Sequence, residues 1–112
     1  MKSERSSCGI ARTLEILGDK WSLLIVRDLM RFGTRTFGEL AELSEGISTH
    51  TLTERLKRLG EFGLIRRKPY QSHPVRYEYS LTKRGKALRP VILSMLEWAG
   101  GNLPRRRKKR SA

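Results

Sequence analysis

The sequence has little cysteine and no long apolar run, and each absence excludes a class of protein. Cys8 is the only cysteine among 112 residues, so no disulfide can form within one chain. No Cys-x-x-Cys pair or His/Cys cluster stands at zinc-ligand spacing. The longest apolar run, Leu23–Val26, has four residues, whereas a membrane helix needs about 20. The polar N-terminus lacks the apolar region of a secretory signal. We therefore expect a cytoplasmic protein that uses no metal and no cofactor.

Motifs of enzyme active sites are also missing. The sequence contains no glycine-rich phosphate loop and no nucleophile motif. The eleven carboxylates are scattered over different predicted helix faces and do not gather in one place. The sequence therefore predicts a binding protein and not an enzyme.

Acidic residues are scarce in the second half of the chain, and positive charge gathers there. The chain has 24 Lys and Arg and 11 Asp and Glu, a net charge of +13. Residues 1–54 carry a net charge of −1, residues 55–89 one of +9 and residues 90–112 one of +5. This distribution is typical of polyanion-binding proteins, although a basic surface can also serve solubility alone. Six consecutive cations begin at Arg105, so we expect one domain over 1–104 followed by a disordered basic tail over 105–112.

Apolar residues at helical spacing predict four helices in the first part of the chain. Thr36 and Glu39 form a Thr-x-x-Glu capping box, which marks the start of a helix. Ser48 suits an N-cap, and a stripe of leucines follows it. The expected helices cover residues 10–18, 21 to 31–33, 36–43 and 48–62, and a three-residue turn at 45–47 joins the last two.

A change of period then predicts a β-hairpin. Residues 64–68 form a short run that leads into Pro69, and residues 77–81 alternate apolar and polar side chains. Residues 71–74 lie between them and form a polar tip. Tyr77 and Tyr79 share a strand face with a leucine, and Trp21 lies on an apolar helix stripe, so we interpret all three as core residues.

Thr82 caps one further helix in the prediction, with Gly100 beyond its end. Pro90 lies inside this helix and should kink or divide it. The order is four helices, a hairpin and a helix. This order predicts a mainly α fold with a small β wing, a winged helix-turn-helix with helices at both ends of the chain.

The helix over 48–62 has one leucine face, so its opposite side should point outward. A recognition helix reads base edges in the major groove with its first two turns, and a basic hairpin at 66–76 can contact the backbone or the minor groove. An ordinary solvated helix face and the charged protection of an edge strand are the alternatives. Arg66, Arg67, Lys68 and Arg76 gather on the hairpin. The candidate DNA-binding residues are Ser48, Thr49, His50, Thr53, Glu54, Lys57 and Arg58 on the helix and Arg66, Lys68 and Arg76 on the wing.

Several short motifs occur in order between residues 8 and 99: Gly18–Ser22 leading into Leu24–Ile25, then Phe37–Leu40, Gly46–Ser48, Leu52–Leu56, Gly63–Ile65 and Tyr77–Thr82. Together they resemble the HxlR-type winged helix-turn-helix regulators. The resemblance implies prokaryotic repressors or activators, similar in fold to MarR-type proteins. It also implies homodimers that bind double-stranded DNA and associate through their first and last helices. In this chain those helices contribute Ile10, Leu14, Leu17, Leu88, Val91, Ile92, Met95 and Trp98.

The resemblance also draws attention to Cys8, because some members of the family sense oxidants or electrophiles with an N-terminal cysteine. Arg5 and Arg12 lie nearby in the sequence, and a cationic setting favours the thiolate. Alternatively, Cys8 is a small residue packed at the start of the first helix. The chain has Gly9 where many members have proline after this cysteine. Two further departures are Gly60 and Phe62.

Two other functions remain open at this stage. A non-specific nucleic-acid-binding protein of the chromatin or ribosomal kind would explain the basic tail, and a protein-interaction domain could share the fold. The first needs only charge on its binding surface. The partly uncharged face at Thr49, His50 and Thr53 therefore favours a sequence-specific regulator of operator DNA. A protein-interaction domain would not need the charge of +9 over residues 55–89.

Overall fold

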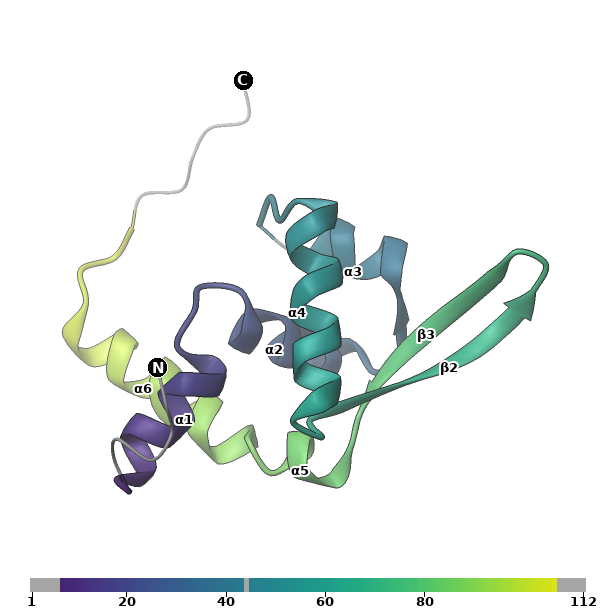
Figure 1. Cartoon of the computed structure of the whole chain (residues 1–112). Helices are drawn as coiled ribbons and strands as arrows, with labels where there is room; N and C mark the ends of the chain where they lie inside the picture. Colours follow the sequence, from purple (N-terminus) through teal and green to yellow (C-terminus); the bar gives the residue numbers. More distant parts are fainter. Residues whose placement is uncertain (1–6, 44, 107–112) are drawn as a thin grey trace.

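Helices form most of the described chain, and a small sheet accompanies them. The computed structural model describes residues 7–43 and 45–106 (Figure 1). The elements are α1 (Gly9–Leu17), α2 (Ser22–Phe32), β1 (Arg35–Thr36), α3 (Phe37–Leu43), α4 (Thr49–Glu61), β2 (Ile65–Ser72), β3 (Val75–Leu81), α5 (Lys83–Lys86) and α6 (Arg89–Asn102).

The predicted caps are present. Thr36 Oγ1 accepts a hydrogen bond from the Glu39 amide at 3.2 Å, and Glu39 Oε1 accepts one from the Thr36 amide at 2.9 Å, which completes the capping box. Ser48 Oγ accepts from the Thr51 amide at 3.1 Å, and Thr82 Oγ1 accepts from the Gly85 amide at 3.2 Å. These bonds confirm the predicted starts of three helices.

The last predicted helix is divided, as expected from its proline. α5 ends at Lys86, and Pro90 lies in the first turn of α6, where a missing N–H costs nothing. The expectation that Gly100 lies beyond the helix is wrong, because α6 continues to Asn102. The Leu103 amide and the Asn102 side chain both donate to carbonyls of the last turn, at 2.9 Å each. These bonds offset the low helix propensity of glycine.

A three-stranded antiparallel sheet in the order β1-β3-β2 carries the wing, which we define as β2, β3 and the turn between them. β2 continues through Pro69 to Ser72, beyond the end predicted for this strand. An edge strand tolerates proline, since one side of its backbone has no partner strand. The short β1 was not predicted. It pairs with β3 through Arg35 and Tyr79.

The core lies between α2, α3, α4 and the base of the wing. Leu52, Leu56 and Leu59 are all buried, which confirms the leucine face of α4. Trp21 and Tyr79 pack against the core as predicted. Tyr77 lies outside it, half-buried on the wing. The prediction for Tyr77 was therefore wrong, because the strand carries this face beyond the reach of the helices.

The wing projects to one side of α4, and α1 and α6 lie on the other (Figure 1). No helix within the described ranges is both long enough and apolar enough to cross a bilayer. Residues 103–106 follow α6 without helix or strand, and the rest of the predicted tail, 107–112, lies outside the described residues.

Candidate nucleic-acid interface

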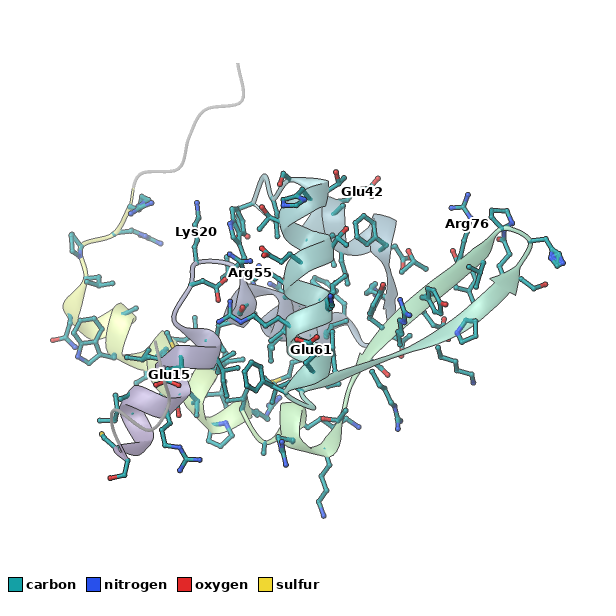
Figure 2. All side chains as sticks on the ribbon, viewed as in Figure 1. Glu15, Lys20, Glu42, Arg55, Glu61 and Arg76 are labelled. Atoms are coloured by element: carbon teal, nitrogen blue, oxygen red, sulfur yellow. The ribbon has the colours of Figure 1, made fainter. Side chains whose placement is uncertain are left out.

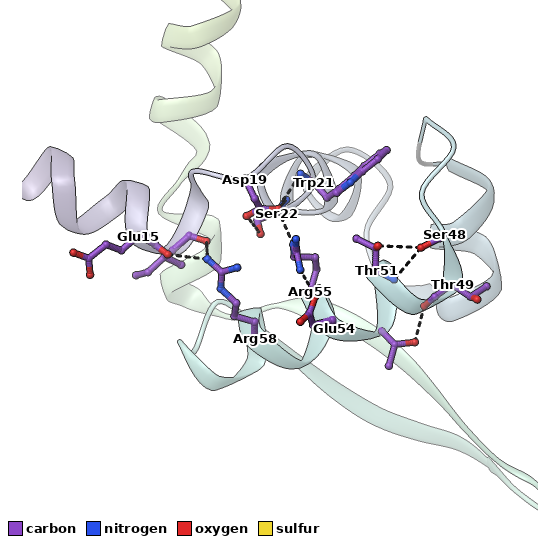
Figure 3. A network of polar contacts seen from close by, with 12 residues as sticks. Glu15, Asp19, Trp21, Ser22, Ser48, Thr49, Thr51, Glu54, Arg55 and Arg58 are labelled. Atoms are coloured by element: carbon purple, nitrogen blue, oxygen red, sulfur yellow. Dashed lines mark hydrogen bonds and ion pairs between the residues drawn. The ribbon is translucent and has the colours of Figure 1, made fainter. Parts of the chain in front are cut away.

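Helix α4 is held in place by an ion pair to the start of α2. Asp19 accepts hydrogen bonds from the amides of Trp21 and Ser22, both at 3.0 Å, and from Ser22 Oγ at 2.6 Å. Arg55, from the middle of α4, donates its Nε to the same carboxylate at 2.8 Å (Figure 3). Desolvation raises the pKa of Asp19, but the hydrogen bonds from Ser22 and Arg55 outweigh it and lower that pKa to about 2.

A second contact ties α4 to α1. The Arg58 guanidinium donates to the carbonyl oxygens of Glu15 at 2.7 Å and Ile16 at 3.1 Å (Figure 3). These carbonyls belong to the last turn of α1, where a cation is favoured by the helix dipole. Arg58 was expected to contact phosphates, but the structure turns its guanidinium inward, away from the exposed side of α4.

The other candidate residues of α4 form an exposed surface. Within the described residues, the side chains of His50 and Lys57 make no hydrogen bond or ion pair, so their polar groups are available to a ligand. The Thr53 hydroxyl donates to the Thr49 carbonyl at 2.8 Å and keeps its acceptor capacity. Glu54 pairs with Arg55, which offsets a negative charge on this surface. Ser48, Thr49, His50, Thr53, Glu54 and Lys57 are all exposed.

The wing divides its basic residues between two faces. Cross-strand pairing joins Arg67 with Tyr79, on the face that leads to the core, whereas Lys68 pairs with Glu78 and Arg66 with Ser80 on the opposite face. Arg76 projects from β3 near the wing tip (Figure 2). The candidate set of Arg66, Lys68 and Arg76 therefore omitted Arg67, the cation on the face that leads to the core. Strict alternation along the strand was the signal that could have identified it.

Helices α1 and α6 expose many apolar side chains. Ile10, Leu14, Val91, Met95 and Trp98 are 43–73% exposed. Leu93, Leu96 and Leu103 are also at least half exposed and were missed, because sequence reasoning followed only one stripe of a helix that is apolar on most of its circumference.

Three of the residues expected at a dimer interface belong to the protomer's own core or pack against it. Leu17 and Ile92 are buried there, at 7% and 8% exposure, and Leu88 packs against the same core. The expectation is corrected for Leu17 and Ile92, because both side chains belong to the protomer's buried core and α1 and α6 both pack against α2.

Comparison with known sequences identifies the family of the chain. The profile of the HxlR-like helix-turn-helix family matches residues 16–107. The chain belongs to the HxlR-like family. This is a family of transcriptional regulators and not of enzymes, as the sequence motifs suggested.

Individual proteins similar to this chain are also regulators. An uncharacterized HTH-type transcriptional regulator of Mycobacterium tuberculosis is 45% identical over 96 residues, which cover 86% of this chain and 60% of that protein. This HxlR-like chain thus spans about 60% of the length of the first curated relatives it matches. Among solved structures, a transcriptional regulator of the MarR family from Porphyromonas gingivalis W83 is 34% identical with a TM-score of 0.79, covering 92% and 100% of the two chains. The redox regulator HypR in its oxidized form is 33% identical with a TM-score of 0.73, covering 88% and 100%.

Cys8 of this HxlR-like protein is exposed at the N-cap of α1. The backbone N–H groups of Ala11 and then Ile10 lower the pKa of its thiol. Within the protomer, Cys8 is therefore not packed against the core. Both of these N–H groups belong to the first turn of α1, and Arg5 lies outside the described residues. In the ranges that the structure describes, no group of three His, Cys, Asp or Glu is placed to hold a metal ion.

Proposed function

We propose that this HxlR-like protein regulates transcription by binding specific double-stranded DNA as a homodimer. Helix α4 would enter the major groove, and the wing would contact the neighbouring backbone or minor groove. The observation that carries this proposal is the exposed α4 surface, whose first two turns are polar and largely uncharged. Arg55 and Arg58 anchor the helix to Asp19 and to the end of α1. A surface that binds only phosphates would not need such a face.

Selection of bound duplexes from a random DNA pool tests this function. The full chain should enrich one sequence with two inverted half-sites, their centres about one helical turn or roughly 34 Å apart. Enrichment of no sequence, together with equal affinity for all duplexes, would favour the non-specific nucleic-acid-binding alternative.

The apolar residues of α1 and α6 support the homodimer. Soluble monomers rarely leave a contiguous apolar surface of this kind uncovered. Met95 and Trp98 line a shallow groove on α6 together with Val91 and Leu103. A second copy would cover these side chains and set two α4 helices about a two-fold axis.

We propose a second role for Cys8 as a thiol sensor of oxidants or electrophiles. Its exposure and lowered pKa support this role, and HypR, which the chain resembles, is described as a redox regulator. Mild oxidation or alkylation should change DNA affinity in the wild type and leave Cys8→Ser unaffected. With one cysteine in each chain, oxidation can produce a disulfide between two chains, a disulfide with a small thiol or an oxygen-containing acid of Cys8 itself. Non-reducing electrophoresis detects the disulfide between chains, and mass spectrometry distinguishes the other products. Equal responses of both proteins would contradict the sensor role.

A further inference from the structure

A cleft separates α4 from the wing, and its walls carry positive charge. Its charged lining residues are Lys57 and Glu61 on α4 and Arg66 and Arg67 on β2, so three cations outnumber one carboxylate. Arg66 lines this cleft and also a separate hollow that includes Ser80, its partner on the other face of the wing. Thus Lys57 and Arg67 are the cations that face each other across it, with Glu61 as the acidic lining residue at the lower end of α4 (Figure 2).

Arg67 is held in a defined position by an aromatic ring. Its guanidinium lies over the ring of Tyr77, with 4.0 Å between the guanidinium carbon and the ring centroid. The two residues share one face of the wing, because Arg67 pairs with Tyr79 and Tyr77 pairs with Pro69. A guanidinium stacked on a ring keeps its N–H donors at its edge and loses less side-chain entropy when an anion binds.

The geometry of B-form DNA indicates what occupies this cleft. One sugar–phosphate strand separates each major groove from the adjacent minor groove. If α4 lies in the major groove and the wing reaches the neighbouring minor groove, that strand must pass between them. We propose that the cleft holds this DNA strand and that Lys57 and Arg67 bind its phosphates, with Tyr77 as the positioning residue for Arg67. The inference rests on the proposed function and adds to it the backbone contact that sets the register of α4.

The wing supplies a matched control for the test. Lys68 has the same charge as Arg67 and is its neighbour on β2, but it pairs with Glu78 on the opposite face. The full-length wild type, Arg67→Ala, Lys57→Ala and Lys68→Ala are compared on the duplex selected from the random pool, at several salt concentrations. A second series of this duplex carries one neutral methylphosphonate at each backbone position in turn.

Loss of one phosphate contact has a defined signature. Arg67→Ala should bind roughly eightfold more weakly at about 0.1 M salt, and the slope of log K against log salt should fall by about 0.9. One or two methylphosphonate positions, between the bases read by α4 and the minor groove reached by the wing, should weaken the wild type and Lys68→Ala but leave Arg67→Ala unchanged. A methylphosphonate at an adjacent backbone position should likewise weaken the wild type and Lys68→Ala but leave Lys57→Ala unchanged.

The role of Tyr77 is tested by coupling. Tyr77→Phe should retain full affinity, because the ring remains. Tyr77→Leu should weaken DNA binding in the wild-type background but not in the Arg67→Ala background. Equal weakening in both backgrounds would assign Tyr77 to the stability of the wing alone and overturn its positioning role. The methylphosphonate series on Arg67→Ala does not depend on how well the Tyr77 variants fold.

Two results overturn the inference in different ways. If the wild type selects a duplex but Arg67→Ala still responds to every methylphosphonate as the wild type does, the strand does not pass through the cleft and the proposed function stands. If the wild type prefers no duplex, the proposed function fails and the inference fails with it.

Discussion

The Nε of Arg55 donates to Asp19 Oδ2 across 2.8 Å, although 36 residues separate the two in the chain. The same carboxylate caps the start of α2 through Trp21 and Ser22. One side chain therefore fixes the N-terminus of α2 and orients the middle of α4. This ion pair anchors α4 to the start of α2, while Thr53 and Lys57 on the same helix stay exposed.

This ion pair predicts a pH-dependent stability. The pKa of Asp19 is about 2 in the folded protein and 3.8 ordinarily, so the unfolded chain takes up this proton first as pH falls. The stabilisation is complete above about pH 5 and is lost as pH falls to about 2. The shift corresponds to about 2 kcal/mol, which partial solvent exposure reduces to about 1–2 kcal/mol.

Urea unfolding of the wild type and Asp19→Asn measures this contribution. Asp19→Asn should lower the free energy of unfolding by about 1–2 kcal/mol at pH 7, and the difference should shrink between pH 5 and pH 2. Glu42→Gln, an exposed change on α3, is the control and should change stability little at any pH. A difference between the wild type and Asp19→Asn that is as large at pH 2 as at pH 7 would contradict the ion-pair account.

Lys57 and Arg58 are neighbours in sequence, but we expect Lys57 to bind DNA and Arg58 to stabilise the fold. Arg58→Ala removes two hydrogen bonds to α1 and should destabilise the fold by about 1–2 kcal/mol. Lys57→Ala removes an exposed cation and should leave stability within about 0.5 kcal/mol while weakening DNA binding. Thermal unfolding and a DNA titration on both variants check this division. The assignment fails if Lys57→Ala destabilises the protein more than Arg58→Ala does.

Helix and wing should differ in what they contribute to DNA recognition. His50 is exposed on α4, the helix that enters the major groove in the proposed complex, so His50→Ala should change base preference at its own position by about 1–3 kcal/mol. Arg76→Ala, near the wing tip, should weaken binding to all sequences alike. Affinities for the selected duplex and its single-base variants measure both effects. A shift in preference with Arg76→Ala and none with His50→Ala would reverse the assignment.

The exposed apolar side of α6 predicts a dimer in solution. Met95→Lys places a charge among side chains that a second copy would cover, so it should convert the dimer to a monomer at micromolar concentration. Glu97→Lys is the matched control on the same helix, because Glu97 is exposed and lies outside the apolar groove. Sedimentation velocity decides the outcome. The interface is elsewhere if Met95→Lys sediments as the wild type does.

Removal of the basic tail should affect affinity and not specificity. Deletion of residues 105–112 takes away six cations. The slope of log K against log salt should become shallower by about 0.9 for each lost phosphate contact, whereas the preferred sequence and the unfolding transition should stay the same. If the shortened protein loses all DNA binding at moderate salt, the tail is the binding element and the non-specific alternative gains support.

The sequence by itself determined the helix starts and the division of the last helix. Thr36, Ser48 and Thr82 were found as caps because each contact joins residues three apart, and Pro90 acts on its own turn. Contacts this short depend little on the rest of the chain.

Only the tertiary structure decided which charged and apolar side chains face outward. Arg58 lies one residue from Lys57, yet its guanidinium reaches carbonyls 42 and 43 residues away. Leu17 turns to the core while Leu14, on the same stripe, stays exposed. Periodicity gives the angle of a side chain around its own helix, but its surroundings depend on which elements pack there. Those long-range contacts made Arg58 a structural residue and left Lys57, with Arg67, facing the cleft between α4 and the wing.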